Sequence, residues 1–176
     1  MDKYQNKYRI PSARLQGYDY GSNGMYYVTI CTKNREHYFG EIVTTVETGN
    51  CPSLQPTIIG NIANQYWTEI PKHYPFVELD EFVIMPNHIH GILFFNKPDY
   101  NEWKPNQFGV QSKNLGAVIR GFKSTTKRYA NDNKIEFEWQ ARFHDHIIRD
   151  EQSLHNIRQY IVDNQSKWAD DEYNKP

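Results

Sequence analysis

The sequence predicts an α+β fold in which helices pack on an antiparallel sheet, in a ferredoxin-like (RRM-like) β-α-β-β-α-β-α arrangement. Four segments are rich in β-branched and aromatic residues, which favour strands, and three others repeat apolar residues at helical spacing. They alternate in an order that suits one antiparallel sheet covered by helices. At 176 residues the chain is long enough to bury the core of a single domain.

The four expected strands differ in their side-chain patterns. Residues 25–32 (MYYVTICT) are mostly β-branched or aromatic, and residues 77–84 alternate between apolar and polar. A Pro-Asn turn follows, so the strand expected at 88–95 (HIHGILFF) forms a hairpin with the one before it. Residues 138–149 (EWQARFHDHIIR) predict a fourth strand with a bend.

Three helices are expected between and after these strands. Residues 57–74 carry isoleucines at helical spacing and end among prolines. Residues 115–129 have an apolar side and a basic side. A last helix begins at a cap formed by Asp150 or Ser153 and is expected to run to about Trp168.

The remaining segments are expected to be less regular parts of a single domain spanning 1–176. Residues 1–24 are polar and rich in turn formers, which predicts an irregular N-terminal arm. Residues 41–47 are expected to extend the first strand, whereas 49–56 and 96–114 are expected to be loops.

The charge distribution bears on the kind of partner. The net charge is −1 and the sequence pI is near 6.6, unlike a general nucleic-acid binder, which is usually basic. Residues 104–130, however, contain six basic residues and no acidic one, which forms a local positive zone suited to phosphate. Aromatic residues make up 15% of the chain and can build a core or stack on bases.

Membrane and secreted classes are disfavoured. No apolar run approaches the roughly 18 residues of a membrane span, and the polar N-terminus lacks a secretion signal. The two cysteines, Cys31 and Cys51, form no CxxC motif. We therefore expect a reduced, cytoplasmic protein without a membrane partner.

His88 and His90 are the first candidate site residues. They lie two positions apart on an expected strand, so both imidazoles point to one side while Ile89 points to the other. Two such imidazoles can chelate a metal ion with one further ligand, although two ordinary polar residues on a sheet face are the alternative. Their position directly after a turn favours the metal, and Gly91 is expected to leave room for a ligand.

A second pair, His144 and His146, flanks Asp145 near the end of the fourth strand. These side chains could hold a metal, contact DNA, or form structural hydrogen bonds. We take His146 as a candidate DNA contact and leave the role of His144 open.

Tyr160 is the candidate nucleophile on the last helix. Asn164 lies four residues later, on the same helix face. A phenol has a pKa near 10 and needs a metal ion or a positive field to attack as phenolate. A divalent ion on His88 and His90 would supply that field, and Asn164 offers an uncharged oxygen to complete the set. Such nitrogen and oxygen ligands suit Mg²⁺ or Mn²⁺. A packed or merely exposed tyrosine is the alternative.

Arg120, Lys123 and Lys127 form a basic stripe on the helix expected at 115–129. The stripe could follow a phosphate backbone or be the solvated side of an amphipathic helix. The absence of acidic residues around it favours phosphate, so these three are candidate DNA contacts.

Four segments resemble a known family. Residues 85–93 (MPNHIHGIL) resemble the HUH segment of single-tyrosine transposases. Residues 17–42 resemble the N-terminal segment of the REP-associated tyrosine transposases. Residues 139–150 (WQARFHDHIIRD) and 157–168 (IRQYIVDNQSKW) resemble the closing segments of that branch. The four occur in the family's order and span about 8–168, which is far more specific than any one motif.

The resemblance implies roles for individual residues. His88 and His90 match the family's metal ligands, Tyr160 matches its nucleophile, and Asn164 matches the third ligand. The branch often has Asn-Pro where this chain has Asn-Gln, so Asp163 is an alternative oxygen donor.

The resemblance also implies an activity. Members of the family cut single-stranded DNA beside hairpins, leaving a 5′-phosphotyrosine and a free 3′-OH without ATP, and rejoin by the reverse step. This implies a transposase or endonuclease that uses Mg²⁺ or Mn²⁺. Its partner would be hairpin DNA from palindromic repeats or insertion-sequence ends, and it would be a monomer or homodimer at the nucleoid. A catalytically inactive hairpin-binding protein is the alternative.

Overall fold

A computed structural model describes residues 15, 17–44, 51–98 and 113–174, together with the backbone of 3–4 and 7–8. In the N-terminal region, β1 (Lys3–Tyr4) and β2 (Lys7–Tyr8) pair as a small antiparallel ladder. No helix in the described part of the chain is both long and apolar enough to cross a membrane.

The main sheet has four strands: β3 (Gly24–Cys31), β6 (Val77–Ile84), β7 (His88–Phe95) and β8 (His144–Ile148). Their spatial order is β6-β7-β3-β8, and every neighbouring pair is antiparallel. The first and third strands of the sheet along the chain therefore occupy its centre. This arrangement confirms the predicted α+β class with an antiparallel sheet and helices packed on it.

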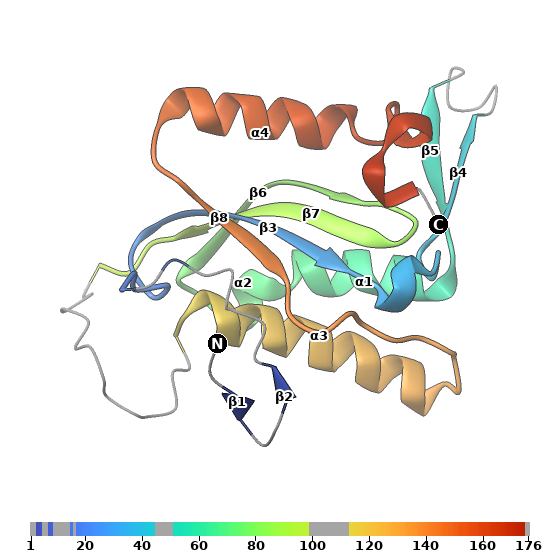
Figure 1. Cartoon of the computed structure of the whole chain (residues 1–176), viewed down its shortest axis with the longest axis horizontal. Coiled ribbons are helices and arrows are strands. Elements are labelled where there is room, and N and C mark those ends of the chain that lie inside the picture. Colours follow the sequence, from blue (N-terminus) through green and yellow to red (C-terminus); the bar gives the residue numbers. More distant parts are fainter. Residues whose placement is uncertain are drawn as a thin grey trace.

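Helices cover both sides of the sheet (Figure 1). Helices α1 (Ile58–Thr68), α2 (Ile70–His73) and α3 (Leu115–Asp132) lie on one side, and α4 (Glu151–Asp163) lies on the other. Side-chain oxygens cap three of them by accepting a backbone N–H, as helix N-termini require; the caps are Thr57 on α1, Asn114 on α3 and Asp150 on α4.

The two sides of the sheet carry separate apolar clusters. The larger lies between the sheet and helices α1 and α3, and it includes the fully buried residues Trp67, Tyr26 and Phe95. The smaller joins α4 to the sheet through four buried residues, Ile92, Ile148, Leu154 and Ile161. Alternation along the strands produces both clusters, because successive side chains point to opposite faces.

Three segments differ from expectation. Residues 40–44 and 52–56 pair with each other as β4 (Gly40–Thr44) and β5 (Pro52–Pro56), so the first is no extension of β3 and the second is no loop. The prolines lie at the ends of β5, where a missing N–H is tolerated. The last helix ends at Asp163 rather than near Trp168, and two 3₁₀ turns follow it, η2 (Trp168–Asp170) and η3 (Glu172–Asn174).

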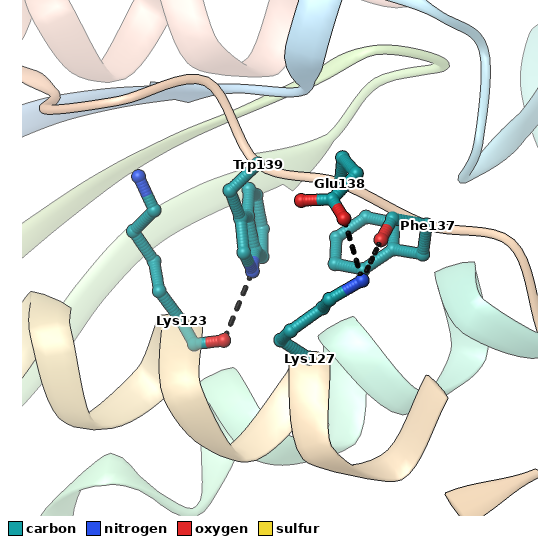
Figure 2. A network of polar contacts seen from close by, with 5 residues as sticks. All are labelled: Lys123, Lys127, Phe137, Glu138 and Trp139. Atoms are coloured by element: carbon teal, nitrogen blue, oxygen red, sulfur yellow. Dashed lines mark hydrogen bonds and ion pairs between the residues drawn. The ribbon is translucent and has the colours of Figure 1, made fainter. Parts of the chain in front are cut away.

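The fourth strand is shorter than expected. In the segment before it, Glu138 and Gln140 bond to the backbone of Lys33 and Cys31 at the end of β3, and lysine side chains of α3 bond other carbonyl groups. Lys127 Nζ donates to Phe137 O at 2.6 Å, and Lys123 Nζ donates to Arg142 O at 2.9 Å and to Gln140 O. The indole of Trp139 in turn donates to Lys123 O at 3.0 Å (Figure 2). Regular pairing therefore begins only at His144, apart from an isolated bridge between Thr32 and Trp139.

The sequence suggested that Gly91 leaves room for a ligand. The structure shows that it does not. It follows His90 on β7 and so points to the opposite face, toward α1. A Cβ at this position would lie 2.3 Å from Cζ2 of the buried Trp67 indole. The glycine instead allows α1 to approach the sheet closely.

Gly91→Ala is therefore expected to lower the free energy of unfolding by about 1–3 kcal/mol through overpacking against Trp67. Urea denaturation of the variant and the wild type measures the effect. In a Trp67→Leu background, where the indole is gone, the added methyl should cost less. An equal cost in both backgrounds would show that Trp67 is not the obstacle.

Candidate active site

The two histidines of β7 lie on the face of the sheet that α4 covers. His88 is fully buried and His90 is 1% exposed, and their ring centroids are 4.4 Å apart. Ile89 between them belongs to the core on the other face. The strand period therefore brings the two imidazoles together in a site with very little water.

The side chain of Asn87 determines the tautomer of His88. Its amide nitrogen donates to Arg35 O at 3.0 Å and to Tyr173 O at 2.8 Å, so its oxygen faces His88 Nδ1 at 2.8 Å. An amide oxygen only accepts, and therefore Nδ1 of His88 carries the proton. The lone pair is then on Nε2, as a metal-binding imidazole requires.

His90 is held by hydroxyl groups of the neighbouring strand. Its Nδ1 lies 2.7 Å from the Tyr27 hydroxyl and 2.9 Å from Thr29 Oγ1. Tyr27 also stacks on the imidazole, with 5.5 Å between ring centroids. These contacts orient the ring so that Nε2 faces the Tyr160 hydroxyl at 3.4 Å.

Tyr160 and Asn164 approach the pair from α4. The Tyr160 ring meets His90 edge-on at 5.2 Å, and 44% of the residue remains exposed. Asn164 is the C-cap of α4 and is 2% exposed. All four predicted site residues thus lie at one place, although His90 and Tyr160 are 70 positions apart in the chain.

Two buried polar atoms at this place have no hydrogen-bond partner: His88 Nε2 and Asn164 Oδ1. Leaving a buried acceptor unsatisfied is costly, and native proteins rarely do so without a reason. Both atoms carry lone pairs of the kind that bind a divalent cation, so these residues fit such a group. Among the described residues no three His, Cys, Asp or Glu side chains gather at one point, so an amide oxygen is the available third ligand.

Asp163 is differently placed. Its carboxylate accepts from Gln159 Nε2 of α4 at 2.8 Å and from Lys167 Nζ of the turn after α4 at 2.8 Å, and both of these side chains are exposed. These bonds lower the pKa of Asp163 and occupy its oxygens. Of the two oxygen donors left open by the sequence, only Asn164 is buried and unpartnered.

The position of α4 depends on contacts with the edge strand β6. A register irregularity between Leu79 and Phe82 turns Asp80 toward the helix, and Arg158 binds it with two hydrogen bonds, one of 2.8 Å. One turn beyond Tyr160, Gln165 donates to Ile84 O at 3.4 Å. These contacts place Tyr160 on the side of α4 that faces His90.

Burial controls the protonation of the site. It lowers the pKa of His88 well below the ordinary value and lowers that of His90 to about 3, so both rings are neutral and able to act as ligands. Burial raises the pKa of Tyr160 and is the largest cause. The Asn164 side chain acts in the opposite direction, and the carboxylates of Asp171 and Glu172 make smaller contributions that raise the pKa. The chain by itself therefore keeps the phenol protonated, and its ionisation requires added positive charge.

The C-terminal turns form a wall beside His88. The Tyr173 ring lies 4.5 Å from the His88 ring, and Arg35 lies 5.0 Å above the outer side of Tyr173. Trp168 lies 6.1 Å from His88. Sequence reasoning did not identify this wall, nor Tyr27, Thr29 and Asn87, because their role depends on contacts between distant segments.

Helix α3, which carries the basic residues, lies on the opposite side of the sheet from α4 (Figure 1). Lys123 and Lys127 hold the segment before β8, and Lys127 also pairs with Glu138 at 2.9 Å (Figure 2). Arg120 is exposed. A role of the three in binding DNA stays a prediction.

His144 and His146 are exposed on β8, on the face that carries the site. His146 borders a hollow of about 470 Å³ between β8, β3 and the first half of α4. Its role as a DNA contact also stays a prediction.

Comparison with known proteins shows what the chain is similar to. No family model matches the sequence. An uncharacterized protein of Haemophilus influenzae is 38% identical over 171 residues, which are 92% of this chain and 91% of that protein. A provisionally named REP-associated tyrosine transposase of the same organism is 26% identical over 155 residues, 85% of this chain and 74% of that protein.

A solved structure shares the fold. It is a REP-associated tyrosine transposase bound to a REP hairpin, with a TM-score of 0.57 and 18% identity, covering 90% of this chain and 74% of that one. The chain belongs to one family with the uncharacterized Haemophilus influenzae protein. It is similar in sequence and in fold to REP-associated tyrosine transposases.

The buried imidazoles predict a dependence of stability on pH in metal-free protein. In the unfolded chain histidine titrates near 6.5, whereas burial lowers the folded-state pKa of His90 to about 3 and lowers that of His88. Below pH 6.5 the unfolded state therefore binds protons that the folded state does not. The free energy of unfolding should decrease as the pH falls, by at most about 1.4 kcal/mol per pH unit for each histidine.

Urea titrations with a chelator at about pH 7, 6 and 5 measure this slope. His90→Gln removes one of the two groups and should give a shallower slope. A slope that does not change on this substitution would contradict the assignment.

Proposed function

We propose that the protein is a metal-dependent DNA transposase and endonuclease, which nicks and rejoins single-stranded, hairpin-bearing DNA through a 5′-phosphotyrosine on Tyr160. The observation that carries the proposal is the convergence of the Tyr160 hydroxyl, 3.4 Å from His90 Nε2, with the unpartnered His88 Nε2 and Asn164 Oδ1. The similarity to REP-associated tyrosine transposases supports it, and one such transposase has been solved bound to a REP hairpin.

In the proposed site His88, His90 and Asn164 would hold a divalent cation, Mg²⁺ or Mn²⁺. A cation there would polarise the phosphoryl oxygens and stabilise the charge that develops on them. Asn87 keeps the lone pair of His88 on Nε2, and Tyr27 and Thr29 keep the His90 ring oriented. Such supporting contacts determine how well a site binds its metal.

Tyr160 performs the proposed chemistry. Its phenolic oxygen attacks the phosphorus, a Tyr160 O–P bond forms, and the bond from phosphorus to the 3′-oxygen breaks. The products are a 5′-phosphotyrosine and a free 3′-OH, and rejoining is attack by a 3′-OH on the same phosphorus. Each step exchanges one phosphodiester for another, so no ATP is needed. The 44% exposure of Tyr160 lets a DNA strand reach it.

The proposal is tested with purified protein, a labelled hairpin oligonucleotide and Mn²⁺. The wild type should give a covalent protein–DNA adduct that survives denaturation. Tyr160→Phe removes only the hydroxyl oxygen of a half-exposed side chain, so it should fold and bind DNA but form no adduct. An adduct of undiminished yield from this variant would show that another residue is the nucleophile.

Two other outcomes identify rival functions. Hairpin binding that survives both chelator and His88→Ala, with no adduct under any metal, would identify a binding protein without chemistry. Turnover without a covalent intermediate would identify a phosphoesterase that uses water.

The third ligand is tested with a matched pair of neighbouring variants. Mn²⁺ at about 100 times its dissociation constant should stabilise the wild type by roughly 2.7 kcal/mol, because it binds the folded state. Asn164→Ala should lose most of this stabilisation, whereas Asp163→Ala should keep it, since the Asp163 oxygens are bonded to Lys167 and Gln159. Thermal unfolding with and without Mn²⁺ measures both. The reverse pattern would assign the ligand to Asp163.

A further inference from the structure

His144 occupies a place on the sheet that the proposed chemistry does not yet use. Strand pairing aligns four residues in one row on the α4 side: Val83, His90, Thr29 and His144. His144 is thus separated from the buried His90 only by Thr29. Two inter-strand spacings of about 4.8 Å put their Cα atoms roughly 10 Å apart.

Thr29 lies between the two histidines in this row. Thr29 is small and 4% exposed, and its hydroxyl is turned toward His90. His144 on the edge strand is exposed. The row therefore runs from residues buried beside α4 to an exposed edge at His144, which a DNA strand can reach from solvent.

The direction from which Tyr160 attacks determines which atom of the DNA would lie next to His144. Contacts of Arg158 and Gln165 hold the second half of α4 above the opposite edge strand, β6. Tyr160 therefore reaches the row from the β6 side. In-line displacement places the leaving oxygen on the far side of the phosphorus from the attacking one. That side faces β3 and β8, where His144 lies.

A hollow on the same side can take the leaving nucleotide. It measures about 470 Å³ and is lined by Tyr27, His146, Asn156 and Ile157, among others. This volume is in the range of small-ligand sites. Tyr27 and His146 are partners in the row next to that of His144. A DNA strand that lies along the row could therefore continue into the hollow, in the direction away from Tyr160.

We propose that His144 is the general acid that protonates the leaving 3′-oxygen during cleavage, and the general base that removes the proton from the 3′-OH during rejoining. This role rests on the proposed function. In cleavage the Tyr160 O–P bond forms, its phenol proton passes to solvent, the P–O3′ bond breaks, and O3′ takes a proton from the His144 imidazolium. Rejoining returns that proton to His144. An imidazole can serve in both directions near neutral pH.

The experiment compares two hairpin substrates after the wild-type cut has been mapped. One has the natural 3′-oxygen at the cut, and the other has a bridging 3′-sulfur, which leaves as thiolate and needs no proton. Both are assayed for single-turnover adduct formation in Mn²⁺. His144→Ala and His144→Gln should slow the oxygen substrate by at least ~100-fold. On the sulfur substrate both should be about as fast as the wild type.

Controls separate this role from folding and from simple DNA contact. His155→Ala, an exposed histidine of α4 outside the row, should leave both substrates unaffected. Circular dichroism checks that the His144 variants fold, and the glutamine variant keeps the size of the side chain. Equal slowing on both substrates would assign His144 to DNA contact, and no slowing on either would remove its role; both overturn the proposal. If the wild type forms no adduct on either substrate, the proposed function fails and this inference with it.

Discussion

The pairing of β7 with β3 in one register is the constraint on which the rest of the structure depends. It sets Thr29 beside His90 and Val28 beside Gly91. Because side chains alternate, the same register turns both histidines toward α4 and turns Gly91 toward Trp67 of α1. A slip by one residue would bury the isoleucines on the site face and drive both histidines into the apolar core. The core and the site therefore stabilise a single register together.

Burial of two imidazoles is unfavourable unless their polar atoms are bonded. The neighbouring backbone and side chains satisfy one nitrogen of each ring, through Asn87 for His88 and through Tyr27 and Thr29 for His90. The second nitrogen of each ring is directed to the same region as Asn164 Oδ1. Supporting hydrogen bonds fix the orientation of the rings, and the low pKa values that burial imposes keep them neutral.

Periodicity predicted much of this arrangement. A two-residue period placed His88 and His90 on one face, and a four-residue spacing placed Tyr160 and Asn164 on one side of a helix. The same two-residue period should have placed Gly91 on the opposite face, so the signal for Trp67 packing was present in the sequence. Tyr27 and Thr29 could not be identified in this way, because their contact with His90 depends on the register between strands more than 60 positions apart.

The basic stripe on α3 shows a different limit. Charge on one side of a helix does not reveal whether another segment of the chain covers it. The carbonyl groups of Phe137, Gln140 and Arg142 accept protons from the ammonium groups of Lys127 and Lys123. Figure 2 shows the bond from Lys127 to Phe137. Burial lowers the pKa of Lys123 to about 8, as expected for an ammonium group partly removed from water. The lysines thereby hold the segment that leads into β8.

The strand that carries the histidines and the helix that carries Tyr160 are held in the fold by different amounts of buried contact. The histidines belong to a central strand whose other face packs against the large cluster beneath α1 and α3. Tyr160 belongs to α4, which the sheet holds through four buried apolar residues, the Arg158–Asp80 pair and the turns after Asn164. Free energies of local opening follow the amount of buried contact, so α4 should open before the strand does. In the proposed function, a tyrosine on the less firmly held layer would let a DNA strand enter and leave, while the imidazoles opposite it would keep their positions.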